Sequence, residues 1–284
     1  MTGPGGRRRR GARAATATPA RLRPDQPGTA RAPCYAPAVP ADELVAVAGP
    51  LISQLGGLFY FEAEATAKAA ELGLSPFQFY LLGRAGVFGD ADAAVVHSAL
   101  GYFNPELIDK RWNAAKAIVP PREGMRAYLE CCAAFGRRYL TKLPGLPAFC
   151  VAAEAVRDAA SPAGLPLFAG IAAEPLAPDT PGRAMQLVTV LREFRGGAHL
   201  LAVVACGLDP KTAHYLSRPD VFFNFGWEPG DVPVVTDEDR ARLRRANEMT
   251  EQLMAPAFGV LDQDGTDALL HGLRIMRKAI PDPA

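Results

Sequence analysis

The chain has 284 residues, of which 49% are hydrophobic and 21% are charged, and its formal net charge is +1. This length and apolar content suffice for one large domain or two smaller ones with a buried core, and no run of about 18 apolar residues predicts a membrane span. The first residues lack the apolar stretch of a secretory signal, so we expect a cytoplasmic protein whose five cysteines are reduced.

Charge is distributed unevenly along the chain. Residues 1–40 contain eight arginines and one acidic residue, whereas residues 41–284 contain 23 basic and 29 acidic residues. The basic part is rich in Arg, Ala, Pro and Gly and has little apolar surface to bury, so it is predicted to be a disordered tail. The rest of the chain is mildly acidic, and we therefore do not expect it to bind nucleic acid.

From residue 41 onward the apolar pattern is helical. Asp42 is a candidate cap for the first helix, and the stretch 57–73 is amphipathic and closes at Gly73. Ser75 and Thr236 are suitable caps for two later helices. Further helices are predicted, in chain order, over residues 75–90, 91–104, 105–119, 122–140, 146–160, 183–207, 236–254 and 265–280.

Two stretches lack this helical period. Residues 164–182 read as a turn-rich connector, and residues 208–235 contain aromatics, Pro and Gly without a regular pattern. Strand signals are nearly absent. The sequence therefore predicts an all-α multi-helix bundle, with an N-terminal helical domain over 41–175 and a C-terminal one over 176–284.

Polar residues interrupt the longest predicted helix at residues 191–200, LREFRGGAHL. Arg192 and His199 are seven residues apart, so they point only about 20° apart on a helix. The glycine pair at 196–197 costs about 1 kcal/mol per residue in helix propensity, which indicates that a helix or a ligand approaches the backbone closely. One hypothesis is a structural Arg–Glu network through Glu193 beside a hydrogen-bonded core histidine. The other is a pocket wall in which Arg192 binds an anionic or carbonyl group and His199 transfers a proton.

Other segments add candidates to this site. Glu62 follows an aromatic run and is a candidate inward-facing carboxylate, whereas Arg84 is either a salt-bridged core arginine or a ligand anchor. A single histidine in an apolar helix, such as His97, is more often a core residue than a functional one. The residues expected to carry acid–base chemistry are His199, Glu193 and Glu62. The residues expected to bind substrate are Arg192, Arg195, Arg84, Tyr60, Tyr80, His97 and Tyr102.

The sequence contains none of the common cofactor or nucleophile motifs. It has no GxGxxG after a strand, no GxxxxGK[ST], no HExxH and no GxSxG. The five cysteines show no metal-ligand spacing. We therefore expect no metal and no cofactor.

Several stretches resemble the actinobacterial SalK-like family, whose members are classed as helix-turn-helix proteins. The resemblance spans roughly residues 45–260 and rests on YFEAEATAKAAELGLSPFQFYLLGRAGVFGD, on GLPLFAG and on LREFRGGAHLLAVVACGLDP. Its most specific part is residues 191–199, where the family pattern is Leu-Arg-Glu-His-Arg-Gly-Asp-Gly-His. Departures of this chain from that pattern include Phe194, in place of His, and Gly197, in place of Asp.

The resemblance implies a MarR-like winged helix in the C-terminal half. The segment after Pro210 is too short, and too rich in Pro, Gly and acidic residues, for both a recognition helix and a basic wing, so we expect this unit to be degenerate. Residues that could face a DNA groove there are Lys211, Thr212, His214 and Arg218.

Three functions are compatible with these observations. The first is a small-molecule-binding, cofactor-independent acid–base enzyme of specialised metabolism, such as a lyase, a cyclase or a condensing or tailoring enzyme. The second is a MarR-like transcriptional regulator, and the third is a ligand-binding protein without catalysis. The expected partner is a small-molecule ligand, without nucleic acid or membrane, and a homodimer is compatible with the sequence.

Overall fold

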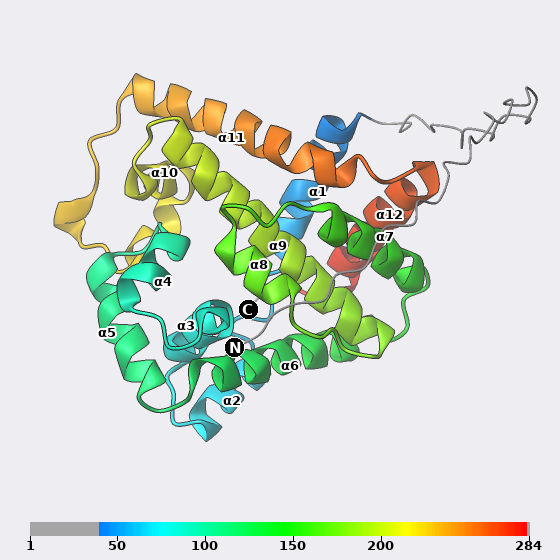
Figure 1. Cartoon of the computed structure of the whole chain (residues 1–284), viewed down its shortest axis with the longest axis horizontal. Helices are drawn as coiled ribbons and strands as arrows, with labels where there is room; N and C mark the ends of the chain where they lie inside the picture. The colour runs from blue at the N-terminus through cyan, green and yellow to red at the C-terminus, as the bar shows by residue number, and fades with distance from the viewer. Residues whose placement is uncertain (1–39, 283–284) are drawn as a thin grey trace, which may run out of the picture. The chain divides into compact units, whose positions relative to one another are not determined.

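The computed structural model describes residues 40–282, so the predicted basic tail lies almost entirely outside the described residues. Every regular element in this part of the chain is a helix, which confirms the all-α prediction (Figure 1). The α-helices are α1 (Ala41–Leu55), α2 (Ala63–Glu71), α3 (Pro76–Ala85), α4 (Ala93–Leu100), α5 (Pro105–Lys116), α6 (Pro121–Leu140), α7 (Leu146–Ala159), α8 (Pro166–Ala172), α9 (Thr180–Ala205), α10 (Pro210–Ser217), α11 (Asp237–Phe258) and α12 (Gln263–Ala279). Short 3-10 helices are η1 (Gly86–Phe88), η2 (Pro219–Phe225) and η3 (Pro229–Asp231).

Helix α9 is the element on which the other helices pack. It is 26 residues long and begins where the Asp179 side chain accepts a hydrogen bond from the Gly182 amide. It contacts α1, α6, α7, α8 and α11, and Figure 1 shows it running through the middle of these helices. The residues from Ala184 to Leu191 are all buried, because partners surround this part of the helix.

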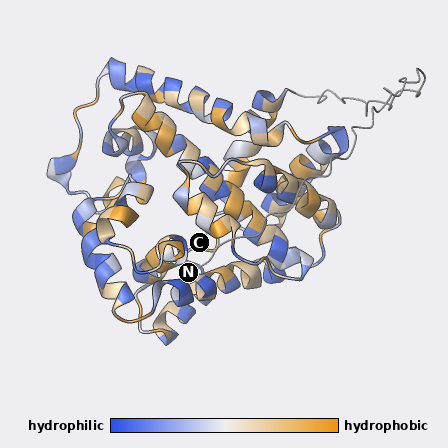
Figure 2. Cartoon of the chain, viewed as in Figure 1, coloured by the Kyte–Doolittle hydropathy of each residue, from blue (hydrophilic) through white to orange (hydrophobic). Residues whose placement is uncertain are grey.

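The main core is rich in aromatic side chains, and a smaller apolar cluster lies around Ala202, Val203 and Leu208. Trp112, Tyr128, Phe59, Phe149 and Phe168 are among the largest fully buried side chains. Figure 2 shows α9 as mostly apolar, whereas α11 carries many hydrophilic residues. Three of the predicted buried cysteines do lie in the core as free thiols, namely Cys131, Cys132 and Cys150.

Capping residues in the sequence predicted several helix starts correctly. Ser75 and Thr236 form capping boxes with Gln78 and Asp239, respectively, and α3 and α11 begin immediately after them. Asp42 is not a cap, because α1 already starts at Ala41 and Pro40 occupies the capping position. The predicted connector at 164–182 contains the short helix α8, so the connector prediction was wrong in that part.

The predicted helix over 57–73 is shorter than its sequence pattern suggests. Its first part is a turn, and α2 begins only at Ala63. The turn packs directly on α9: a Cβ on Gly56 would lie 2.7 Å from the Cβ of Arg192 and 2.9 Å from the backbone oxygen of Val188. Tertiary contact with α9 therefore overrides the amphipathic pattern, and the turn carries Tyr60 towards α9.

The predicted domain boundary near residue 175 falls between α8 and α9. Helix α9 packs on α6, α7 and α8, which precede the boundary, and on α11, which follows it. The described residues 40–282 belong to one compact unit. The division into two domains stays a prediction.

Within residues 40–282, no helix is both long and apolar enough to cross a membrane.

Candidate functional site

The interior between α3 and α9 holds a bidentate ion pair. Arg84 of α3 donates hydrogen bonds from Nε and Nη2 to the two carboxylate oxygens of Glu193 on α9, at 2.9 and 2.7 Å. The side chains are 12% and 1% exposed. Burial alone would raise the pKa of Glu193, but Arg84 and Arg192 outweigh that effect and hold the pKa below its ordinary value. Glu193 is therefore an anion in the folded protein.

Two tyrosines and a second arginine complete this cluster. The Tyr60 hydroxyl donates to Glu193 Oε1 at 3.1 Å and accepts from Arg192 Nη1 at 2.7 Å. Arg192 Nη1 also lies 3.1 Å from Glu193 Oε1, and its guanidinium stacks 4.8 Å from the centre of the Tyr60 ring. Arg84 Nη1 donates to the Tyr80 hydroxyl at 2.6 Å. The predicted Arg–Glu network is thus present, with two arginines sharing one carboxylate.

This cluster forms one wall of a cavity of about 390 Å³. The lining comes from α1, α3, the end of α4, α8, α9, α10, η2 and α11. The charged residues of the lining are Arg84, Arg192, Glu193, Arg195 and Arg218, and its histidines are His199 and His214. Apolar side chains such as Leu100, Leu200 and Phe225 also line the cavity. A cavity of this size and mixed lining is typical of small-molecule sites.

The two adjacent glycines of α9, Gly196 and Gly197, have different roles. A Cβ on Gly196 would meet no atom within 4 Å, so this residue leaves the cavity wall open. A Cβ on Gly197 would lie 2.9 Å from Leu165 Cδ2, so this residue allows the segment before α8 to pack closely. The predicted close approach of a facing segment therefore applies to Gly197, whereas the approach of a ligand to Gly196 stays a prediction.

His199 is held in one tautomer by its neighbour on α11. Its Nδ1 lies 3.1 Å from Thr250 Oγ1, and that hydroxyl donates to the backbone oxygen of Ala246 at 2.6 Å. Because the hydroxyl proton is already engaged, Nδ1 must be the donor, which leaves Nε2 with a free lone pair. Burial, and then the nearby Arg195 guanidinium, lowers the pKa of His199 to about 4. The imidazole is therefore neutral at pH 7.

Tyr102 and His214 present polar atoms that lack a hydrogen-bond partner among the described residues. These atoms are the Tyr102 hydroxyl oxygen and His214 Nε2, and both residues line the cavity. Burial, and then Arg218, lowers the pKa of His214 to about 4, although Asp220 acts in the opposite direction. A buried polar atom without a partner costs about 1–3 kcal/mol, so each of these two atoms destabilises the fold as it stands.

Most of the predicted site residues lie at this cavity. Arg84, Arg192, Glu193, Arg195, His199, Tyr80 and Tyr102 line it. Tyr60 lies behind the wall, where it positions Arg192 and Glu193 rather than reaching a ligand.

Two predicted site residues lie outside the cavity lining. Glu62 precedes α2 at the end of the turn and makes no hydrogen bond through its side chain with the described residues. His97 Nε2 lies 3.0 Å from the backbone oxygen of Phe103, so His97 is the bonded core-type histidine that its apolar helix favoured. The aromatic run before Glu62 did not turn its carboxylate inward, because the chain forms a turn there instead of a helix.

The segment after α9 supplies site residues that the sequence did not assign to the pocket. His214, Ser217, Arg218 and Phe225 line the cavity from α10 and η2. The segment is anchored where the Asn104 amide donates to the backbone oxygen of Phe225, at 2.9 Å, and the Phe225 ring stacks on Phe103 at 4.1 Å. No local sequence pattern predicts that the chain returns to the cavity after α9. The aromatic residues within 208–235 could have indicated that this segment packs on the rest of the protein.

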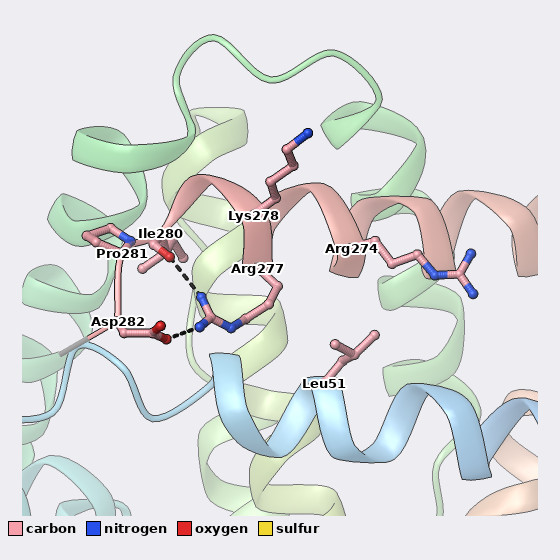
Figure 3. A pocket seen from close by; sticks show the side chains of 7 residues that line it. All are labelled: Leu51, Arg274, Arg277, Lys278, Ile280, Pro281 and Asp282. Atoms are coloured by element: carbon pink, nitrogen blue, oxygen red, sulfur yellow. Dashed lines mark hydrogen bonds and ion pairs between the residues drawn. The ribbon is translucent and has the colours of Figure 1, made fainter.

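A second hollow lies at the surface near the end of α12 (Figure 3). Its volume is about 530 Å³, and Leu51 lines it together with residues of the chain's last part. Arg277 is already bonded there to the Ile280 carbonyl and the Asp282 carboxylate.

In residues 40–282, no group of three or more His, Cys, Asp and Glu side chains could hold a metal ion. The central cavity is therefore the stronger candidate site.

A family model described as a helix-turn-helix family matches residues 47–223, which is more than half of the chain. The chain belongs to this helix-turn-helix family. The match includes α3, α9 and α10 and thus nearly all of the cavity lining. No curated protein and no solved structure matches the chain.

In this member of the helix-turn-helix family, two of the four residues expected to face a DNA groove are buried, whereas Lys211 is half-buried and Arg218 is exposed. Thr212 and His214 are 9% and 7% exposed, respectively, and Thr212 bonds to Asp209. The Lys211 ammonium lies 5.1 Å from the Trp227 ring centre, and Arg218 lines the cavity. The described residues after α10 contain 3-10 helices instead of the strands of a wing. The described segment between α10 and α11 thus contains no strands for a wing, and the degenerate winged helix stays a prediction.

We expect Glu193→Ala to lower the free energy of unfolding by about 3–5 kcal/mol, because it leaves Arg84 and Arg192 as uncompensated buried charges. Glu64→Ala removes a carboxylate from an exposed pair with Arg138 and is expected to cost under about 1 kcal/mol. Chemical denaturation of both variants measures the difference. Equal losses in the two variants would contradict the buried ion pair.

Stability should fall as pH decreases from about 6.5 to about 4.5. Both His199 and His214 have folded-state pKa values lowered to about 4, so in this interval the unfolded chain binds more protons than the folded one. Each histidine contributes a loss of about 3 kcal/mol at most. We expect His199→Gln to flatten the pH dependence of the unfolding free energy, whereas the exposed His271→Gln leaves it unchanged. A His199→Gln profile parallel to that of the wild type would disprove the buried neutral state.

Proposed function

We propose that the protein binds a small molecule in the central cavity. The observation that carries this proposal is the convergence of arginine, histidine and tyrosine side chains from α3, α9 and α10 on one partly apolar space of about 390 Å³. The open backbone face of Gly196 and the unpartnered atoms of Tyr102 and His214 support it. Apolar walls with a few placed polar groups provide both affinity and orientation.

A more specific form of this proposal is that the protein also catalyses an acid–base reaction on the bound molecule. It is supported by the free Nε2 lone pair of His199, which the bond to Thr250 orients. A histidine with a pKa of about 4 is a weak base at pH 7, so catalysis requires a ligand that raises this pKa. Binding without catalysis requires no such change and is therefore the function that the geometry supports best.

DNA-binding regulation is the second candidate, because membership of a helix-turn-helix family is compatible with it. The burial of Thr212 and His214 opposes it, as does the acidic balance of residues 41–284. For this chain to read a groove, α10 would have to leave the cavity wall.

A larger side chain at position 196 should block the cavity without disturbing the fold. We expect Gly196→Leu to abolish ligand-induced stabilisation, because the new side chain projects from the open face of α9 into the space for the ligand. The control is Gly230→Leu in η3. A Cβ there would also meet no atom within 4 Å, but Gly230 does not line the cavity. Thermal unfolding with a panel of neutral and charged aromatic compounds measures the effect. If no compound stabilises the wild type more than Gly196→Leu, the proposed function is wrong.

A truncated protein lacking residues 1–40 should form no sequence-specific complex with DNA at about 1 µM protein and physiological salt, because the remaining chain is acidic. A gel-shift assay with the promoter of its own gene, with the full chain in parallel, tests this expectation. A salt-sensitive, sequence-specific complex of the truncated protein would favour the regulator.

A further inference from the structure

The cavity carries more positive charge than its lining can neutralise. Four arginines and one glutamate line it, and both histidines are neutral at pH 7. Glu193 is occupied by its bidentate bond to Arg84, and it also accepts from Arg192. The lining thus contains four guanidinium groups and one carboxylate. That carboxylate is already bonded to Arg84 and Arg192, so it does not neutralise the other arginines.

Arg195 is a half-buried arginine of this lining that lacks a bonded partner among the described residues. Its side chain makes no ion pair or hydrogen bond with other residues in the described part of the chain. It packs against α1, where a Cβ on Gly49 would lie 3.1 Å from Arg195 Nε. Burial lowers its pKa, and Glu251 on α11 only partly opposes this. A half-buried guanidinium without a hydrogen-bonded partner is costly, and a bound oxyanion would remove that cost.

Two further features restrict the ligand. The Nε2 atom of His214 and the Tyr102 hydroxyl are buried without a hydrogen-bond partner among the described residues, and an oxygen atom of a ligand that reaches them could accept a hydrogen bond from each. Leu100, Leu200 and Phe225 line the same cavity and favour an apolar body. The lining therefore suits a molecule with one charged end and one apolar end.

We infer, on the basis of the proposed function, that the ligand is a small organic oxyanion with an apolar body, held at its charged end by Arg195 together with Arg192. Arg218, at the end of α10, adds positive charge at the cavity and makes no ion pair with the described residues. The planar guanidinium recognises carboxylates and phosphate esters through the same paired hydrogen bonds, so both chemistries fit this arrangement.

Matched pairs of compounds test this inference by calorimetric titration of the full chain. The probes are benzoate against benzamide, phenylacetate against phenylacetamide, and phenyl phosphate against benzyl alcohol. We expect at least one anion to bind at least tenfold more tightly than its neutral partner, and the tighter anion distinguishes a carboxylate from a phosphate ligand. Arg195→Met should weaken that anion at least tenfold, whereas Arg126→Met, which removes an exposed arginine of α6, should not.

The outcomes separate this inference from the proposed function. If neutral compounds bind as tightly as the anions and Gly196→Leu abolishes both, the cavity binds neutral ligands and only the inference is wrong. An anion affinity that is unchanged in Arg195→Met, in a variant with wild-type thermal stability, would also overturn the inference alone. If no compound binds in a manner sensitive to Gly196→Leu, both proposals are wrong.

Discussion

The bidentate bond between Arg84 and Glu193 is the constraint on which the site depends. It joins α3 to α9 in the interior, where a carboxylate that is 1% exposed would be unstable without a charged partner. The same carboxylate accepts from Tyr60 and from Arg192, so one anion fixes three side chains. Because Arg84 also donates to Tyr80, the ion pair determines how two helices and the turn before α2 present their polar atoms.

The ion pair also determines the electrostatics of the cavity. One carboxylate shared by two arginines leaves a net positive charge, and Arg195 adds to it from the next turn of α9. Burial disfavours the charged form of both histidines, and Arg195 beside His199 and Arg218 beside His214 act in the same direction, so His199 and His214 stay neutral. A bound anion would offset part of this effect and would raise both histidine pKa values. Ligand binding and proton uptake are therefore coupled through the same arginines.

The sequence predicted those features that depend on neighbours along the chain. Ser75 and Thr236 specify helix starts through bonds to residues three positions away, and the polar face of α9 follows from helical periodicity. Glu62 was assigned wrongly because contact between Gly56 and α9 replaces the expected helix with a turn. The place of His214 could not be predicted, because the backbone bond between Asn104 and Phe225 that returns α10 to the cavity joins residues far apart in sequence.

Helix α10 connects the family relationship to the cavity. In a helix-turn-helix protein this region would offer polar side chains to DNA, but here Thr212 and His214 face the interior and Phe225 closes the wall. To enter a groove, α10 would have to break the stacking of Phe225 on Phe103 and expose a histidine ring that contacts Phe225 at 3.9 Å. A ligand bonded to His214 would strengthen the contacts that keep α10 on the cavity. Ligand binding and DNA reading by this helix are therefore opposed, and a bound ligand can only disfavour the DNA-reading arrangement.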